Sequence, residues 1–311
     1  MKLRSPGLVI LPLIGVALLC AMAARGRPDD LRGKLQVDGR ERTYVLHVPA
    51  SYNGTQPVPL VLALHGRLGD GEGQEKLTHM DVTSDKHGFL VVYPDGINRS
   101  WADGRAATPA EKKGVDDVKF LSALIDQLAQ QYKTDYSRIY ATGMSNGGFM
   151  SGRLACELSD RIAAVAIVAA SLSDNLAESC HPAEPVSVLI LQGTNDPLVP
   201  FDGGPLGKNG DRGQVLSHEM AIQKWVQLDG CKETKKAVQS ADPSGSSATL
   251  DAPVIHTACR GGVEVADYVV VNGGHTWPGG KQYLPEAIIG KTARDVDASE
   301  LIWQFFAKHQ R

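Results

Sequence analysis

The chain has 311 residues, of which 42% are hydrophobic and 22% are charged, a composition ordinary for a globular protein that buries a core. Its formal net charge of −3 at pH 7 gives no basis for binding to nucleic acid or to an anionic membrane surface. The length suits one large α/β domain or two small ones.

The first residues have the features of a secretory signal peptide. Lys2 and Arg4 precede an apolar run, Leu8–Leu19, and residues 21–23 read Ala-Met-Ala, the small-residue pattern of a cleavage site. The apolar run is shorter than the ~20 residues that a transmembrane helix needs. We therefore expect residues 1–24 to be a signal peptide and no stable membrane span in the protein.

Export places the mature chain, residues 25–311, outside the cell or in a periplasm. A lipid anchor on Cys20 is the alternative, because a cysteine near a cleavage site can carry a lipid. Leu19, directly before it, is bulky where a lipid-attachment site favours a small residue. The sequence therefore favours a cleaved, soluble product over a tethered one.

Strand and helix signals alternate along the rest of the chain. Short apolar runs predict strands buried on both faces, and apolar residues at helical spacing predict helices with one buried stripe. In chain order we expect strands at Thr43–Val48, Leu60–Leu64 and Phe89–Tyr93, a helix at Val115–Tyr132, a strand at Arg138–Thr142, a helix at Phe149–Leu158, strands at Ala163–Val168 and Val186–Leu191, a helix at Leu216–Leu228, a strand at Tyr268–Val271 and a helix at Ala298–Lys308. This order predicts an α/β protein with a mostly parallel central sheet, helices on both faces and a single domain.

Four cysteines remain if the first leaves with the signal peptide, and an even number in an exported chain predicts two disulfides. Of the three possible pairings, Cys156 with Cys180 and Cys231 with Cys259 are favoured because each closes a local loop. Zinc is the other use of four cysteines, but the chain has no C-x-x-C pair. The linker-like stretch Ser240–Ser247 lies inside the second loop, so we interpret it as a pinned excursion and not as a domain boundary.

The most informative motif is Gly143–Gly147, with the sequence GMSNG. It directly follows the predicted strand Arg138–Thr142 and leads into the helix Phe149–Leu158. A strand, a G-x-S-x-G turn and a helix form the nucleophile elbow of serine hydrolases. Ser145 is therefore the candidate nucleophile.

A serine hydroxyl needs an adjacent base, which a carboxylate orients, and in α/β-hydrolases the chain order is serine, acid, histidine. Asp196 follows the predicted strand Val186–Leu191, and His275 follows the strand Tyr268–Val271. Both lie where open α/β sheets build their active sites, at the carboxyl ends of strands. Two rival acids, Asp202 and Asp211, lie farther from the strand end in a glycine-rich loop.

A tetrahedral intermediate also needs donors for its oxyanion, usually two backbone amides. One is expected to be the amide of Asn146, directly after the nucleophile. The second is expected in the loop after Leu60–Leu64, with Arg67 as first choice and Leu68 as the alternative. His65 in the same loop is expected to support the loop and not to act as a base.

Two tryptophans are candidates for the substrate pocket. Trp277 lies two residues after His275, where it can line the pocket or wedge the histidine loop. Trp101 can form a second wall, although burial is the stronger expectation. The Arg67 side chain is expected to be solvated, with contact to an anionic substrate group as the alternative.

Together these segments resemble secreted polyhydroxybutyrate depolymerases and the related feruloyl and acetylxylan esterases, over about residues 35 to 306. The motifs that carry the resemblance are Leu-His-Gly, Tyr-Pro-Asp-Gly ending in Trp101, Gly-Met-Ser-Asn-Gly-Gly, Gly-Thr-Asn-Asp-Pro-Leu-Val-Pro and Gly-Gly-His-Thr-Trp-Pro-Gly-Gly. The resemblance implies an α/β-hydrolase fold, no cofactor, Ser145 as nucleophile, Asp196 as orienting acid and His275 as general base and acid. Relatives that attack solid polymer often carry a further polymer-binding domain, so soluble oligomers or aryl esters are the expected substrates.

Two alternatives stay open. A serine peptidase of the prolyl-oligopeptidase kind shares the order of the triad, although such peptidases usually add a cap domain. A catalytically inactive surface or carbohydrate-binding protein could use the same fold, although a binding module does not need all three triad residues. The leading hypothesis is a secreted serine esterase that takes an ester substrate, with no metal and no nucleic-acid partner.

Overall fold

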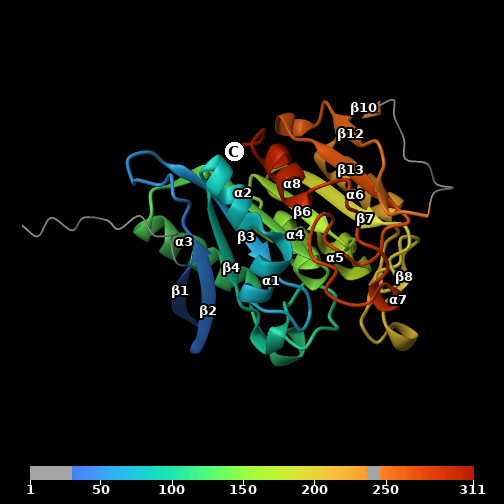
Figure 1. Cartoon of the computed structure of the whole chain (residues 1–311), viewed down its shortest axis with the longest axis horizontal. Coiled ribbons are helices and arrows are strands. Elements are labelled where there is room, and N and C mark those ends of the chain that lie inside the picture. Colours follow the sequence, from blue (N-terminus) through green and yellow to red (C-terminus); the bar gives the residue numbers. More distant parts are fainter. Residues whose placement is uncertain (1–29, 237–245) are drawn as a thin grey trace, which may run out of the picture.

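The computed structural model describes residues 30–236 and 246–311, in which one large sheet runs through the molecule (Figure 1). The order of its strands is β1-β2-β4-β3-β5-β6-β7-β13-β12-β10, and β11 pairs with β13. The strands of this sheet are β1 (Leu31–Val37), β2 (Arg40–His47), β3 (Val58–Leu64), β4 (Leu90–Pro94), β5 (Thr134–Met144), β6 (Ala164–Val168), β7 (Ser187–Gly193), β10 (Glu233–Lys236), β11 (Thr249–Leu250), β12 (Val254–Thr257) and β13 (Val265–Val271). A separate hairpin pairs β8 (Gly204–Pro205) with β9 (Gln214–Val215).

The central strands, in the order β4-β3-β5-β6-β7-β13, are all parallel to their neighbours. Antiparallel strands extend both sides, with β2 and β1 beyond β4, and β12 and β10 beyond β13. Because the central strands are parallel, their carboxyl ends all meet at the same edge of the sheet. Loops that leave this edge are therefore brought together even when they are far apart in sequence.

Helices cover both faces of the sheet. They are α1 (Gly71–Thr78), α2 (Met80–His87), α3 (Asp117–Gln131), α4 (Asn146–Glu157), α5 (Asp174–Ser179), α6 (His218–Asp229), α7 (Glu286–Ile289) and α8 (Ala298–Phe306). Side chains of α3, α4, α5 and α6 share one apolar core, whereas side chains of α2 and α8 contribute to a second core. Helices α2 and α8 pack against each other.

The alternation of side chains along β3 shows how the sheet separates these two cores. Leu60, Leu62 and Leu64 belong to the core under α3 and α4, while Val61 and Ala63 belong to the core under α8. All five are fully buried. Continuous apolar runs are required in such strands because both faces are covered, and this confirms the prediction of a mostly parallel sheet with helices on both faces.

Some elements extend or correct the predictions. The strand expected at Thr43–Val48 is β2, and β1, which pairs with it at the edge of the sheet, was not predicted. Asp116 caps α3 by accepting the Lys119 amide at 2.9 Å, as expected of an acidic residue at a helix start. Asp117 instead forms a buried ion pair with Arg42 of β2, at 2.6 Å, and so ties the helix to the edge of the sheet.

Two disulfides join the pairs of cysteines favoured from the sequence. Cys156 in α4 is bonded to Cys180 at the end of α5, and Cys231 after α6 is bonded to Cys259 after β12. In the chain-entropy model, a disulfide that closes a loop of this size stabilises the folded state by about 3 kcal/mol.

The predicted signal peptide and Cys20 lie outside the described residues, as does most of the linker-like stretch Ser240–Ser247. No helix in the described part of the chain combines the length and the apolar character needed to cross a membrane.

Candidate active site

Ser145 sits in a strained turn between β5 and α4. Its φ of 56° and ψ of −119° lie in a region that residues other than glycine rarely adopt. The Ser145 amide donates to the carbonyl of Val168 at 2.9 Å, which holds the turn against β6. This is the strand–turn–helix geometry of a nucleophile elbow.

The glycines on either side of the serine are required by close packing. A Cβ on Gly143 would lie 2.6 Å from the carbonyl oxygen of Leu64, and one on Gly147 would collide with the same oxygen. Both distances are far below a permitted contact, so the turn can press against β3 only with glycine at both positions. The spacing of the G-x-S-x-G motif thus follows from the approach of α4 to β3.

Asp196 and His275 form a buried pair. His275 Nδ1 lies 2.8 Å from Asp196 Oδ2, and Asp196 Oδ1 accepts the amides of Leu198 and Val199, both at 2.8 Å. A carboxylate held in this way fixes the ring with its proton on Nδ1 and leaves Nε2 as the basic nitrogen. The rival acids Asp202 and Asp211 are exposed.

The backbone of His275 is fixed as well. Its amide donates to the carbonyl of Ile289 at 2.6 Å, and its carbonyl accepts the hydroxyl of Tyr283 at 3.0 Å. Burial, together with the charge of Asp196, raises the pKa of Tyr283, so this hydroxyl remains a donor at neutral pH. In the described residues the hydroxyl of Ser145 forms no hydrogen bond with His275; such contacts are often long until a substrate is bound.

The oxyanion candidates lie on two elements beside the serine. Asn146 is the first residue of α4, so its amide has no acceptor within the helix. The loop after β3 passes over the elbow, since a Cβ on Gly66 would lie 3.6 Å from the Ser145 Cβ. The amide of Arg67 has no partner in the described residues. Leu68, the alternative second donor, is wrong, because its amide already donates to the carbonyl of Arg99 at 2.8 Å.

His65 supports this loop through both ring nitrogens. Nε2 accepts the amide of Gly96 at 2.9 Å, so the ring proton is on Nδ1, which donates to the carbonyl of Gly66 at 2.8 Å. Burial lowers the pKa of His65, which favours this neutral tautomer. The geometry is that of a support and offers no free nitrogen for proton transfer.

The two tryptophans expected at the substrate pocket are buried instead. Trp101 is 0% exposed and Trp277 is 1% exposed, so neither presents a surface to a substrate. The indole of Trp277 donates to the hydroxyl of Ser299 at 3.2 Å, which makes it a wedge under the histidine loop. Trp101 packs between His65 and Phe120. Of the two expectations for each residue, burial is the one that the structure bears out.

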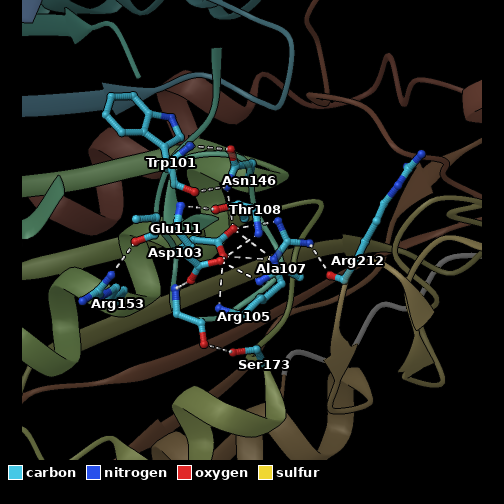
Figure 2. A network of polar contacts seen from close by, with 12 residues as sticks. Trp101, Asp103, Arg105, Ala107, Thr108, Glu111, Asn146, Arg153, Ser173 and Arg212 are labelled. Carbon is cyan, nitrogen blue, oxygen red and sulfur yellow. Dashed lines mark hydrogen bonds and ion pairs between the residues drawn. The ribbon is translucent and has the colours of Figure 1, made fainter. Parts of the chain in front are cut away.

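A polar network beside the elbow was not predicted (Figure 2). Asp103 is fully buried and accepts the Asn146 side chain at 2.5 Å. Arg105 donates to both oxygens of the same carboxylate, and its guanidinium lies 4.3 Å over the Phe149 ring. Burial raises the pKa of Asp103, and the charge of Arg105 opposes this shift.

Glu111 folds the loop that carries this network. Its carboxylate accepts the backbone amides of four residues at 2.8–3.0 Å, namely Gly104, Ala106, Ala107 and Thr108. Burial opposes the charge, but these donors outweigh it and lower the pKa of Glu111. Thr108 and Glu111 have the spacing of a capping box, and Glu111 N–H also donates to the threonine hydroxyl. That spacing was the one signal in the sequence that could have revealed the loop.

Across residues 30–236 and 246–311, no cluster of three or more His, Cys, Asp or Glu side chains is placed to hold an ion.

A mostly parallel sheet, a strained serine after one strand and a buried aspartate–histidine pair after two others define an α/β-hydrolase. Solved structures agree on the fold: the acetyl xylan esterase from Aspergillus awamori superposes with a TM-score of 0.54 at 13% identity, over 79% of this chain and 94% of that one.

The sequence profile described as esterase PHB depolymerase matches residues 42–199, which is half of the chain. The relative named "Putative esterase NocK", from Nocardia uniformis subsp. tsuyamanensis, is 31% identical over 86% of this chain and 80% of its own length. Feruloyl esterase C from Emericella nidulans is 28% identical over 80% of this chain and 81% of its own length. The chain belongs to the esterase PHB depolymerase family, and it is a carboxylic-ester hydrolase.

Proposed function

We propose that the chain hydrolyses carboxylic esters through an acyl-enzyme on Ser145. The observation that carries this proposal is the strained, glycine-flanked serine at the same sheet edge as the buried Asp196–His275 pair. His275 Nε2 takes the serine proton as Oγ attacks the ester carbonyl carbon, and the carbonyl π electrons move to oxygen. The amides of Asn146 and Arg67 stabilise that oxyanion.

The intermediate collapses when His275 returns the proton to the alkoxy leaving group, which departs as the alcohol. A water molecule then attacks the acyl carbon and gives a proton to His275 Nε2. The second tetrahedral intermediate collapses as His275 returns that proton to Ser145 Oγ, the bond between Oγ and the acyl carbon breaks, and the acid leaves. Asp196 stabilises the imidazolium that forms twice in the cycle.

We propose feruloyl or other aryl esters, or short hydroxyalkanoate oligomers, as the substrate class. Exposed apolar side chains on two of the loops that carry site groups support an apolar substrate group. Leu68 follows Arg67 on the oxyanion loop, and Leu198 lies two residues after Asp196. Relatives named feruloyl esterase support the aryl-ester part of this class.

We also propose that residues 25–311 are a single exported domain, with residues 1–24 removed. The support is the signal-like N-terminus, the two disulfides and the one large sheet that spans the described residues. Attachment through Cys20 is the minor alternative.

A panel of esters tests the proposal: 4-nitrophenyl acetate, methyl ferulate, acetylated xylan and a soluble hydroxybutyrate trimer, each with wild type and Ser145→Ala. We expect wild-type turnover of at least one ester and a loss of about 10⁴-fold or more in kcat for the variant. The preferred ester chooses between the aryl and polyester classes. Full activity in Ser145→Ala would refute the mechanism, and an inert, folded wild type would support the binding-protein alternative.

A further inference from the structure

The two amides assigned to the oxyanion come from elements that the chain does not join directly. Asn146 begins α4, whereas Arg67 lies in the loop after β3. Stabilisation of an oxyanion requires both donors at about 2.7–3.1 Å from one point. The ladder between β3 and β5 ends at Leu64 and Gly143, before either donor, so further contacts must fix the distance between the two amides.

Trp101 is bonded to both of them. Its backbone amide donates to Asn146 Oδ1 at 2.8 Å, and its carbonyl accepts Asn146 Nδ2 at 3.1 Å (Figure 2). Its indole N–H donates to the carbonyl of His65 at 2.9 Å. One residue thus joins the first residue of α4 to the loop that carries Arg67.

The direction of each bond on the α4 side is settled by chemistry. Asn146 Nδ2 faces two acceptors, the Trp101 carbonyl and Asp103 Oδ2, so the amide cannot be reversed. Asp103 is held in turn by the guanidinium of Arg105. The Asn146 side chain is therefore locked, and it locks the backbone of Trp101.

In the loop after β3, supporting hydrogen bonds act on the peptide unit that carries the Arg67 N–H. The carbonyl of Gly66 belongs to the same peptide unit as the Arg67 N–H, and in a trans peptide the two point in opposite directions. That carbonyl accepts His65 Nδ1 at 2.8 Å and the Gly69 amide at 3.0 Å. Holding the carbonyl from one side aims the Arg67 N–H to the other.

The indole ring keeps this arrangement rigid. It is 0% exposed, with its centroid 4.8 Å from that of His65 and 6.5 Å from that of Phe120. A buried carbonyl that loses its donor cannot recover one from water, so the His65 carbonyl depends on this indole N–H. The indole ring contributes packing, and its N–H contributes the hydrogen bond that links Trp101 to the His65 carbonyl.

We propose that Trp101 is a positioning residue that sets the separation of the two oxyanion donors, through the Asn146 side chain on one side and His65 on the other. The proposal rests on the proposed function, because it needs Asn146 and Arg67 as the donors. Trp101 touches no reacting atom in this mechanism.

The test is Trp101→Phe, which removes the indole N–H and keeps an aromatic ring. Trp225→Phe is the matched control, since Trp225 is also fully buried and its indole N–H has no partner in the described residues. For the best ester of the panel we expect Trp101→Phe to lower kcat by about 10-fold to 100-fold with KM within about twofold of wild type, because the lost interaction belongs to the transition state. Trp225→Phe is expected to match wild type.

A trifluoromethyl ketone analogue of that ester separates positioning from general damage. It adds to Ser145 and forms a tetrahedral oxyanion, so its Ki should rise in Trp101→Phe by about the same factor as kcat/KM falls. Inhibition by the product acid, which forms no oxyanion, should not change. A loss of kcat with unchanged ketone affinity, or equal losses in both tryptophan variants, would overturn the proposal.

A second variant keeps the test decisive if Trp101→Phe folds poorly. Site-specific replacement of Trp101 by benzothienylalanine retains the shape of the indole and puts sulfur in place of the N–H. Normal kcat and ketone affinity in that protein would also overturn the proposal. If Ser145→Ala is inactive while both Trp101 variants behave as wild type, the positioning role fails and the proposed function stands. If Ser145→Ala is active, the proposed function itself fails.

Discussion

A half-buried and a fully buried carboxyl group of this protein, those of Glu111 and Asp229, differ in pKa because of their donors. Glu111 accepts four backbone amides and its pKa is lowered, although burial opposes the charge. Asp229 ends α6, accepts only the Val186 amide at 3.3 Å, and its Oδ2 has no partner within the described residues. Burial raises the pKa of Asp229 to about 7, against opposing contributions from that hydrogen bond and from Arg260.

Asp229 therefore makes the folded state less stable as the pH rises. In the unfolded chain an aspartate ionises near pH 4, so between about pH 4 and pH 7 the folded state holds a proton that the unfolded state has lost. Asp229→Asn removes this difference. The difference between a pKa near 4 and one of about 7 corresponds to roughly 4 kcal/mol, so we expect the variant to gain up to about that much over wild type at pH 8, and nothing from this cause at pH 4.

Urea unfolding of both proteins at pH 5 and pH 8 measures the effect, with Asp160→Asn at an exposed position as the control. A difference between Asp229→Asn and wild type that is equal at the two pH values would contradict this account of Asp229.

At the scale of elements, the turn at Ser145 depends on an unusually close approach of α4 to β3. Gly147 is the point of contact, since a Cβ there would collide with the carbonyl oxygen of Leu64. Gly152, in the same helix, has more room: a Cβ there would lie 3.3 Å from the terminal Cδ1 of Ile167, which can move aside.

We therefore expect replacement by alanine to have opposite outcomes at Gly147 and Gly152. Gly147→Ala must push α4 away from β3, and we expect a loss of about 2 kcal/mol or more in stability together with most of the activity. Gly152→Ala should keep full activity and cost little, because alanine favours helix over glycine by about 1 kcal/mol. Thermal unfolding and ester turnover check both variants. Normal turnover in Gly147→Ala would show that the close approach does not govern the elbow.

The sequence predicted the elements whose signal is local. The strands around Leu62, Val91 and Ile190 are continuous apolar runs. Motifs directly after β5, β7 and β13 placed Ser145, Asp196 and His275 on the loops where they are found. By contrast, β10 (Glu233–Lys236) is exposed along its whole length and exists only through its pairing with β12. Helices α1 and α2 are largely polar, and so gave no apolar stripe to read.

The difference between local and long-range signals also explains which parts of the site could be predicted. The triad follows from motifs within a few residues of each strand, but the support around it depends on contacts between distant segments. Trp101 was a candidate for the pocket wall, with burial as the stronger expectation, and nothing in its sequence neighbours indicates that its indole reaches the carbonyl of His65. The sequence likewise gives no indication of the buried Asp103–Arg105 pair, because Asn146, which donates to Asp103, belongs to another segment.

At the scale of the whole molecule, the two halves are fastened in different ways. A buried ion pair, Arg42 with Asp117, holds the edge strand β2 to α3 near the N-terminal side. Both disulfides lie beyond it, where one joins α4 to α5 and the other joins the end of α6 to the segment after β12. Neither disulfide includes Ser145, Asp196 or His275.

The disulfides should therefore contribute to stability and not to chemistry. Their sequence separations are 24 and 28 residues, so the chain-entropy model gives nearly equal contributions of about 3 kcal/mol each. For a chain of this size that corresponds to a fall of roughly 6–12 °C in Tm for Cys156→Ala/Cys180→Ala and a similar fall for Cys231→Ala/Cys259→Ala.

Calorimetry of the two double variants, and of wild type with and without a thiol reductant, measures these contributions. Because neither bond touches a triad residue, kcat at 25 °C per folded molecule should stay within about twofold of wild type in both variants. A midpoint insensitive to reductant would show that the bonds are absent or idle in solution. If the Cys156–Cys180 variant alone lost kcat, the stability of α4 would be coupled to the elbow at its other end, and that bond would then belong to the catalytic machinery.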